Sequence, residues 1–273
     1  MSTVAVTSEA NGNRAPLIAA GLLGALLIGA ALAPTLAPYA MDALDLANRR
    51  GAPSSLHWFG TDELGRDLLT RVLYGARVSL AIGLISALVS AAIGAAVGSI
   101  AGYAGRWADD VLMRITDAML AIPRLPLLMI TAAVLQPSVA VLVILVGLAG
   151  WMETARVVRA EVLSLAARDF VSAARAIGAS PVRVVLRHVL PGVLPAAAVA
   201  TTLAVGRGIL LESALSFFGV GVQPPTASWG NMLYQAQTTM TSEPWLAIFP
   251  GLMIFLTVLA CNAVGDAIGS ARS

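Results

Sequence analysis

The side chains that could do chemistry are few, and their spacing favours ion pairs over catalysis. Asp62 lies four residues before Arg66, the spacing at which opposite charges meet on one helix face, and Asp67 precedes Arg71 in the same way. Paired carboxylates can perform acid–base chemistry or hold a metal, but each acid has its own arginine and no histidine cluster joins them. We therefore expect no catalytic residue and no metal site, and we interpret His57 as a loop residue.

The sequence lacks the residues that several other kinds of enzyme chemistry require. All seventeen basic residues are arginine, whereas a phosphate-binding P-loop and Schiff-base chemistry both require lysine. The single cysteine, Cys261, can form no disulfide within the chain and is interpreted as a small buried apolar residue. No HExxH or GxSxG motif occurs. The sequence therefore predicts a protein that is not itself an enzyme and carries no cofactor of its own.

Composition places these residues in a membrane. Of 273 residues, 58% are hydrophobic and 12% charged, with a mean hydropathy of +0.83, whereas about a quarter of a soluble domain is charged. Several apolar runs reach the roughly 20 residues that cross a bilayer as a helix. We expect an all-α integral membrane protein. Its six predicted transmembrane helices are residues 17–37, 78–103, 111–135, 138–158, 192–218 and 244–266.

These spans divide the chain into five segments. The segments are an N-terminal tail (1–16), the first transmembrane helix (17–37), an external loop (38–77), a core transmembrane domain (78–266) and a C-terminal tail (267–273). Within the external loop, Thr61 can cap a helix that runs to about residue 76. Leu64, Leu68 and Val72 share one face of it, so we expect an amphipathic helix on the external surface.

Arginine placement predicts the orientation. The 159–191 loop holds five arginines, whereas the 219–243 loop holds none. Positively charged loops stay in the cytoplasm, so both termini and the 159–191 loop are expected there. The 38–77 segment, which also holds five arginines, is the exception.

The polar stretch 168–191, between two apolar blocks, predicts two short helices. Asp169 can cap the first helix, and Gly178 suits the left-handed residue that ends it. Ser180 and Pro181 suit the cap and the first turn of the second helix. Apolar residues recur at helical spacing at Phe170, Ala173, Ala174 and Ile177, then at Val182, Val185, Leu186 and Val189, with Arg183 and Arg187 pointing away. Such an elbow is shaped to dock on a cytoplasmic partner.

The same stretch resembles the coupling loop of membrane subunits of ATP-binding-cassette (ABC) importers. That loop has the pattern Glu-Ala-Ala, three residues, Gly, nine residues, Ile-x-Leu-Pro. Ser172-Ala173-Ala174, Gly178 and Leu190-Pro191 fall on this spacing, with Ser172 in place of glutamate and His188 in place of isoleucine. Residues 57–67 and 209–225, continued by 228–230, resemble the dipeptide/oligopeptide branch of binding-protein-dependent permeases. The resemblance covers nearly the whole chain after the N-terminal tail.

The resemblance implies a type I importer permease fold in a bacterial inner membrane. It implies a permease subunit for short peptides that forms half of a pathway. The expected partners are a second homologous permease subunit, two ABC ATPase subunits that bind ATP and Mg, an extracytoplasmic substrate-binding protein and the lipid bilayer, with no nucleic acid. Similar permeases handle dipeptides, longer peptides, nickel chelates and haem, so the cargo stays open. The alternative function is a secondary transporter or channel subunit.

The resemblance also implies two sets of functional residues. The ATPase-coupling set is Ser172, Ala173, Ala174, Arg175, Gly178, Ser180, Pro181, Arg183, Arg187 and Pro191. The second set lies on the side where the substrate-delivering protein docks, and we expect it to contribute to an outer gate. It comprises Phe217, Phe218, Pro224, Pro225 and Trp229.

Charges within the spans are candidate pathway residues, because a charge in a bilayer is costly unless it is paired or hydrated. Arg124, Arg207 and Glu212 lie within apolar spans. The arginines could pair with Glu212 or Asp117, or line the pathway and meet a peptide carboxylate, and pairing is the preferred interpretation. Asp117 lies three residues after Arg114, and we expect a structural pair there.

Two further patterns predict how the spans bend and pack. Pro123 and Pro126 should kink the third span, since each removes a backbone donor. Small residues recur every four positions at Ser86, Ser90, Gly94, Gly98 and Gly102, and at Gly21, Ala25, Gly29 and Ala33. Such rows allow close helix approach, and we expect both to pack within the subunit, with contact to a second membrane subunit as the alternative for one of them.

Overall fold

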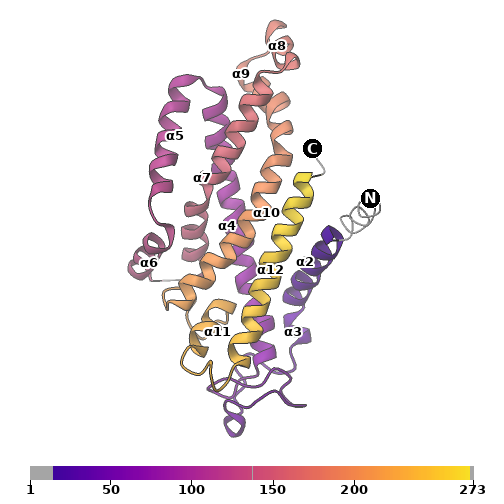
Figure 1. Cartoon of the computed structure of the whole chain (residues 1–273), viewed down its shortest axis with the longest axis vertical. Coiled ribbons are helices and arrows are strands. Elements are labelled where there is room, and N and C mark those ends of the chain that lie inside the picture. Colours follow the sequence, from indigo (N-terminus) through magenta and orange to yellow (C-terminus); the bar gives the residue numbers. More distant parts are fainter. Residues whose placement is uncertain (1–14, 137, 271–273) are drawn as a thin grey trace, which may run out of the picture.

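The structure is a computed structural model that describes residues 15–136 and 138–270 (Figure 1). Its long helices are α4 (Leu68–Tyr103), α7 (Val139–Ala166), α10 (Leu190–Phe217) and α12 (Trp245–Ser270). The others are α2 (Ala15–Ala31), α3 (Ala33–Leu36), η1 (Leu46–Asn48), α5 (Arg106–Ala121), α6 (Arg124–Leu135), α8 (Asp169–Ala176), α9 (Pro181–Val184), the π-helical η2 (Val185–Val189) and α11 (Trp229–Ala236).

The predicted all-α membrane architecture is confirmed, with different span boundaries. Within residues 15–136 and 138–270, four helical stretches are long and apolar enough to cross a bilayer, namely α4, α7, the continuous Pro181–Phe217 run and α12. A fifth span results if α5 and α6 are counted together, and the 17-residue α2 is apolar but shorter. Since α12 continues to Ser270, the start of the predicted C-terminal tail is helical, whereas residues 1–14 of the N-terminal tail lie outside the described part of the chain.

The third span is broken rather than merely kinked. The axes of α5 and α6 differ by 82°. Ile122 is extended at φ −80° and ψ 126°, because the ring of Pro123 disfavours the α conformation in the residue before it. Pro126 lies in the first turn of α6, where its missing N–H is tolerated, and so only the first proline breaks the span.

The predicted external helix at 61–76 is wrong, because α4 begins at Leu68 and continues unbroken to Tyr103. Asp67 is its N-cap and accepts a hydrogen bond from the Thr70 N–H at 2.8 Å. Residues before it are held in a turn by Asp62, whose Oδ1 accepts from the N–H groups of Leu64 and Arg66. At 36 residues α4 spans roughly 54 Å, so its first turns form part of the end of the bundle that carries the 38–67 loop.

The small-residue row of α4 packs against α7, as expected for packing within the subunit. A Cβ built on Gly94 would lie 2.6 Å from Thr154 Cβ, and one on Gly98 would lie 2.5 Å from the Ala155 carbonyl oxygen. The Ser90 hydroxyl donates to the Gly147 carbonyl at 2.7 Å. The two backbones therefore touch over several turns with no room for added carbon.

The row on α2 behaves differently. A Cβ built on Gly21 or Gly29 would meet no atom within 4 Å, and Ala25 is exposed, whereas Ala33 is fully buried. The expectation that this row packs within the subunit is therefore wrong for most of its length, and its face is open in the part of the chain that the structure describes.

The two ends of the bundle carry different features (Figure 1). The elbow helices α8 and α9 stand at one end, where the turn between α4 and α5 also lies. The 38–67 loop and α11 lie at the opposite end. The predicted coupling segment and the predicted gate are thus separated by the length of the bundle.

Candidate functional site

The elbow at 168–191 has the predicted helix–turn–helix shape. Gly178 has φ +85°, the left-handed conformation expected after α8. The Ser180 hydroxyl accepts from the Arg183 N–H at 3.4 Å, and Pro181 opens α9. The N-cap of α8 is Arg168 rather than Asp169, which lies in the first turn, where its carboxylate still complements the helix dipole.

The buried face of the elbow differs from the predicted stripes. Val171 and Ala174 of α8, with Val184 and Val189 of the second helix, pack into one apolar cluster with Val158 of α7. The exposed apolar side chains are Phe170, Ile177, Val182 and Leu186, all members of the predicted stripes. Each stripe is therefore divided, with Ala174 and Val189 in the buried cluster and the others outside it. Neighbouring apolar positions of a short helix compete for burial, and contact with α7 decides between them. Phe170 and Ile177 are thus left exposed on α8, whereas Val182 and Leu186 line a groove with Ile100 and Tyr103 at the end of α4.

Nine of the ten predicted coupling residues are exposed, and Ala174 is the buried one. Arg175 of α8 places its guanidinium 5.1 Å from the centre of the Tyr103 ring at the end of α4. Pro191 lies in the first turn of α10. The predicted boundary of the fifth span at residue 192 is wrong, because α9, η2 and α10 form one run from Pro181 to Phe217. The second arm of the elbow is thus the beginning of a membrane-spanning helix.

The cluster of charges within the spans centres on the partly exposed Glu153 of α7, a partner that the sequence analysis missed. Arg124 Nη2 donates to Glu153 Oε1 at 2.7 Å, and Arg207 Nη1 contacts Oε2 of the same carboxylate. The predicted pairings of the arginines with Glu212 or Asp117 are therefore wrong. These partners lie 29 and 54 positions from Glu153 along the chain, and no local spacing signals them.

Neighbouring charges form separate pairs. Asp117 pairs with Arg156 of α7 at 2.5 Å, and not with Arg114 as the three-residue spacing suggested. Asp109 of α5 pairs with Arg159 of α7. Both pairs join α5 to α7, so the charges on these helices organise contacts between helices rather than along one.

Glu212 is fully buried inside the subunit. Its Oε1 accepts from the Ser216 hydroxyl at 2.8 Å, and its Oε2 accepts from the Ser79 hydroxyl of α4 at 3.0 Å. Ser79 Oγ in turn accepts from the Trp229 backbone N–H at 3.1 Å, and the Trp229 indole donates to the Val72 carbonyl at 3.1 Å. This network ties α10, α11 and α4 together near the outer end.

Replacing Glu212 with alanine should destabilise the protein by about 1–3 kcal/mol, because the serine hydroxyls lose their buried acceptor. Glu212→Gln should cost less, since its amide oxygen can still accept. Thermal unfolding of the detergent-extracted protein measures both. Equal loss in the two variants would show that the hydrogen bonds are not what Glu212 supplies.

Comparison with known proteins shows to which protein family this chain belongs. Residues 94–271 match the family described as "Binding-protein-dependent transport system inner membrane component". The match runs from the last third of α4 through the elbow to α12, well over half of the chain. The chain belongs to this family. It is an ABC importer permease, a multi-pass protein of the inner membrane.

Individual relatives cover nearly all of the permease. A protein of Brucella suis biovar 1 (strain 1330), provisionally named a peptide permease, is 40% identical over 261 residues, which are 95% of this chain and 86% of the relative. The glutathione transport system permease protein GsiD of Escherichia coli O157:H7 is 42% identical over 247 residues, 90% of this chain and 82% of the relative. GsiD of Shigella dysenteriae serotype 1 (strain Sd197) is 43% identical over the same coverage.

The predicted gate residues of the permease divide into two groups. Phe218, Pro224 and Pro225 are exposed, and Phe217 is half-buried against Phe218, with ring centres 5.7 Å apart. Trp229 and Glu212 lie inside the subunit. The exposed group is accessible to a partner. The buried group instead holds the segment between α10 and α11, which contains the exposed residues, against α4. A gating role for either group stays a prediction.

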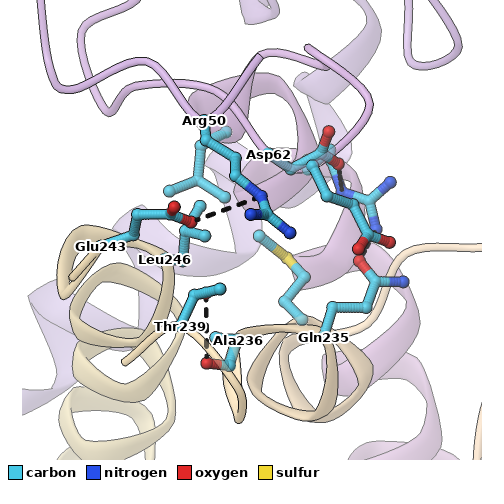
Figure 2. A pocket seen from close by; sticks show the side chains of 11 residues that line it. Arg50, Asp62, Gln235, Ala236, Thr239, Glu243 and Leu246 are labelled. Carbon is cyan, nitrogen blue, oxygen red and sulfur yellow. Dashed lines mark hydrogen bonds and ion pairs between the residues drawn. The ribbon is translucent and has the colours of Figure 1, made fainter. Parts of the chain in front are cut away.

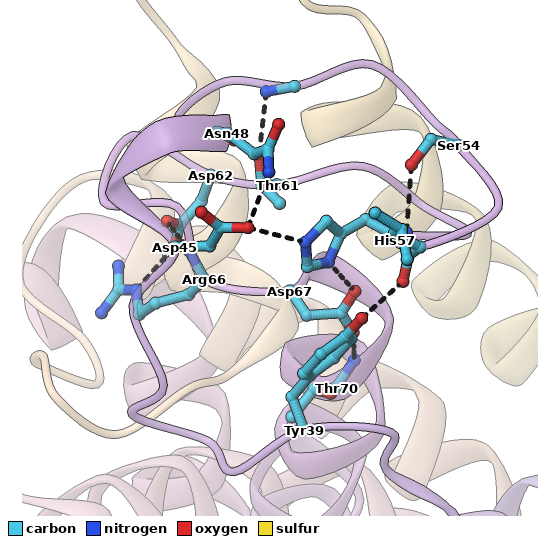
Figure 3. Close-up of polar contacts among 12 residues, drawn as sticks. Tyr39, Asp45, Asn48, Ser54, His57, Thr61, Asp62, Arg66, Asp67 and Thr70 are labelled. Atoms are coloured by element: carbon cyan, nitrogen blue, oxygen red, sulfur yellow. Dashed lines mark hydrogen bonds and ion pairs between the residues drawn. The ribbon is translucent and has the colours of Figure 1, made fainter.

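The 38–67 loop, here called the outer loop, is held by a polar cluster around His57 (Figure 3). The predicted pair of Asp62 and Arg66 is confirmed at 2.7 Å. Asp67 does not pair with Arg71, because Asp67 Oδ1 lies 2.9 Å from His57 Nδ1. His57 is therefore a buried structural residue, not a simple loop residue, and no metal-binding group of three or more His, Cys, Asp or Glu residues is found in residues 15–136 and 138–270.

Two contacts extend this cluster. His57 Nε2 lies 3.5 Å from Asp45 Oδ2, and the side-chain amide of Asn48, which donates to Asp45 at 2.7 Å, lowers the pKa of that carboxyl. Arg71 lies 3.5 Å from Asp62 and donates to Gln235 of α11 at 3.1 Å. It lines a pocket of about 20 Å³ between the outer loop, α11 and α12 (Figure 2), which is room for one water molecule. The cluster thus packs the outer loop onto the bundle.

Proposed function

We propose that the permease is the membrane subunit of an ATP-driven importer for short peptides, forming half of the pathway. The observation that carries this is the elbow, which exposes Phe170, Ile177, Val182 and Leu186 at one end of the bundle and whose second arm continues into α10. An exposed apolar surface next to arginines suits a protein partner. A push on the elbow would reach the middle of the span through one helix.

The proposal assigns the remaining parts of the assembly to other chains. Two ATPase subunits supply the nucleotide site with its ATP and Mg, since this chain has no lysine for a P-loop. A second permease subunit completes the pathway, and an extracytoplasmic binding protein docks at the outer end near Phe218, Pro224 and Pro225. The elbow and both termini face the cytoplasm, as the arginine count predicts.

The peptide cargo rests on the relatives. The Brucella protein is named for peptides, and the Escherichia and Shigella proteins are named for glutathione, which is itself a tripeptide. All three names describe small peptide cargo, so short peptides are the class proposed for this permease.

Purification without crosslinker tests the proposal. A tagged permease extracted from its own cells in mild detergent should bring down a lysine-containing ATPase subunit and a second permease subunit. Proteoliposomes made from this assembly should take up a labelled dipeptide or tripeptide only when ATP and Mg are present on the elbow side. A lone chain whose uptake follows an ion gradient would instead support a secondary transporter.

A further inference from the structure

The cluster of Arg124, Glu153 and Arg207, here called the triad, carries a surplus of charge. One arginine comes from the first turn of α6 and the other from the second half of α10, and both contact the single carboxylate of Glu153 on α7. Two guanidinium groups against one carboxylate leave a net charge of about +1, taking ordinary ionisation. An unbalanced charge at span depth is costly unless water or an anion meets it.

The surroundings of the triad leave one open side. Its floor is made of small residues, among them Ser86 and Ser90 of α4 and Gly208 of α10. Both serine hydroxyls already donate to carbonyl oxygens of the helices. The cavity at this floor measures only about 20 Å³, so nothing larger than a water molecule fits beneath the triad.

The side chains of the triad are nevertheless partly accessible. The exposed fractions are 22% for Arg124, 37% for Glu153 and 42% for Arg207. A ligand would therefore approach from the exposed side, where the guanidinium groups keep donors that Glu153 does not use. A planar guanidinium presents a fork of N–H groups that matches a carboxylate.

We propose that the triad is a transit site for the carboxylate of the peptide being moved, an inference that rests on the proposed importer function. The surplus guanidinium binds the C-terminal carboxylate, and Glu153 competes for the same donors. This competition keeps binding weak, so that the cargo can leave as well as enter, a requirement of any conducting site.

The triad is also connected to the elbow. Arg207 lies on the continuous Pro181–Phe217 run that begins at α9, and Glu153 lies on α7, which ends where α8 begins. A displacement of the elbow changes the separation of Arg207 and Glu153. Movement of the elbow would therefore alter how strongly the site holds a carboxylate.

The test compares a dipeptide with its C-terminal amide in proteoliposomes that contain the full assembly. Initial uptake is measured over a range of concentrations of loaded binding protein. Each variant is compared with the unmodified assembly for each peptide separately, which cancels the preference of the binding protein. Arg207→Met should reduce the transport efficiency for the free carboxylate by roughly 10-fold to 100-fold, the range for loss of one charge-assisted hydrogen bond. Transport of the amide should stay within about twofold.

A second variant, expected to strengthen carboxylate binding, distinguishes the proposal from a simple folding defect. Glu153→Gln removes the competing carboxylate, so the apparent KM for the free-carboxylate peptide should fall about tenfold or more, and release should slow. Arg207→Lys, which keeps the charge, should retain part of the preference for the free-carboxylate peptide over the amide. Arg156→Met is the matched control, because Arg156 also lies on α7 but pairs one-to-one with Asp117. It should not discriminate between the two peptides.

Two results would overturn the proposal. In one, Arg207→Met lowers uptake of both peptides equally or of neither. In the other, Glu153→Gln weakens the preference for the carboxylate instead of strengthening it. Failure of the importer function itself looks different, since the unmodified assembly would then show no ATP-dependent peptide uptake.

Discussion

Replacing Ile177 with aspartate should release the ATPase subunit from the permease while leaving the permease folded. Ile177 is 87% exposed next to the turn at Gly178, which makes it the most exposed of the large apolar side chains of the elbow. Anchors at the centre of a protein interface are worth about 2 kcal/mol or more, which is roughly 30-fold in affinity. A buried carboxylate in place of the isoleucine adds a desolvation cost.

Co-purification of the ATPase subunit and peptide-stimulated ATP hydrolysis measure this loss, and thermal unfolding of the permease should be unchanged. Leu56→Asp is the matched control, because Leu56 is a similarly exposed apolar residue in the loop at the other end of the bundle. Normal recovery of the ATPase with Ile177→Asp would show that the motor docks elsewhere. Loss of the ATPase with both variants would point to a general effect of the added charge.

Replacing Gly98 with valine should prevent stable packing of α4 against α7. Its new Cβ would lie 2.5 Å from the Ala155 carbonyl oxygen and 2.8 Å from Val158 Cβ, so backbone would have to move. Overpacking of a tight contact costs about 1–3 kcal/mol and more where backbone is displaced. In lipid, helices associate through close packing at small residues and not through hydrophobic burial. We therefore expect the yield of folded protein to fall severely.

The yield and thermal unfolding of the detergent-extracted permease check this prediction. Gly21→Val is the matched control, since no atom lies within 4 Å of a Cβ built there. The control should fold normally. A Gly98→Val protein as stable as the Gly21→Val protein would mean that α4 and α7 do not meet through this row.

Local signals in the sequence predicted the elbow well. Gly178, Ser180 and Pro181 each set the conformation of the backbone at or beside their own positions, so the turn and the start of α9 could be read directly. The choice of buried face was not local. Val171 is buried and Phe170 exposed because the position of α7 decides which side of α8 is covered.

The ion pairs show the same division. The i, i+4 spacing predicted Asp62 with Arg66 correctly, because nothing else reaches that carboxylate more closely. The same spacing failed for Asp67, which binds His57 ten positions away. The partner of Arg124 and Arg207 could not be predicted at all, since Glu153 meets them only after three separate helices have packed.

The position of α2 has a consequence for how the permease is made. α2 packs against α12 and α4, so its packing is complete only after α12 has been synthesised. Residues 31 and 245 are 214 positions apart, which at the usual speed of translation is roughly 10 to 40 s. During that interval α2 lies in the lipid without α12, one of the two long helices that it contacts, and is accessible to membrane proteases and insertion chaperones. Synthesis of α12 is thus the step after which α2 can be covered.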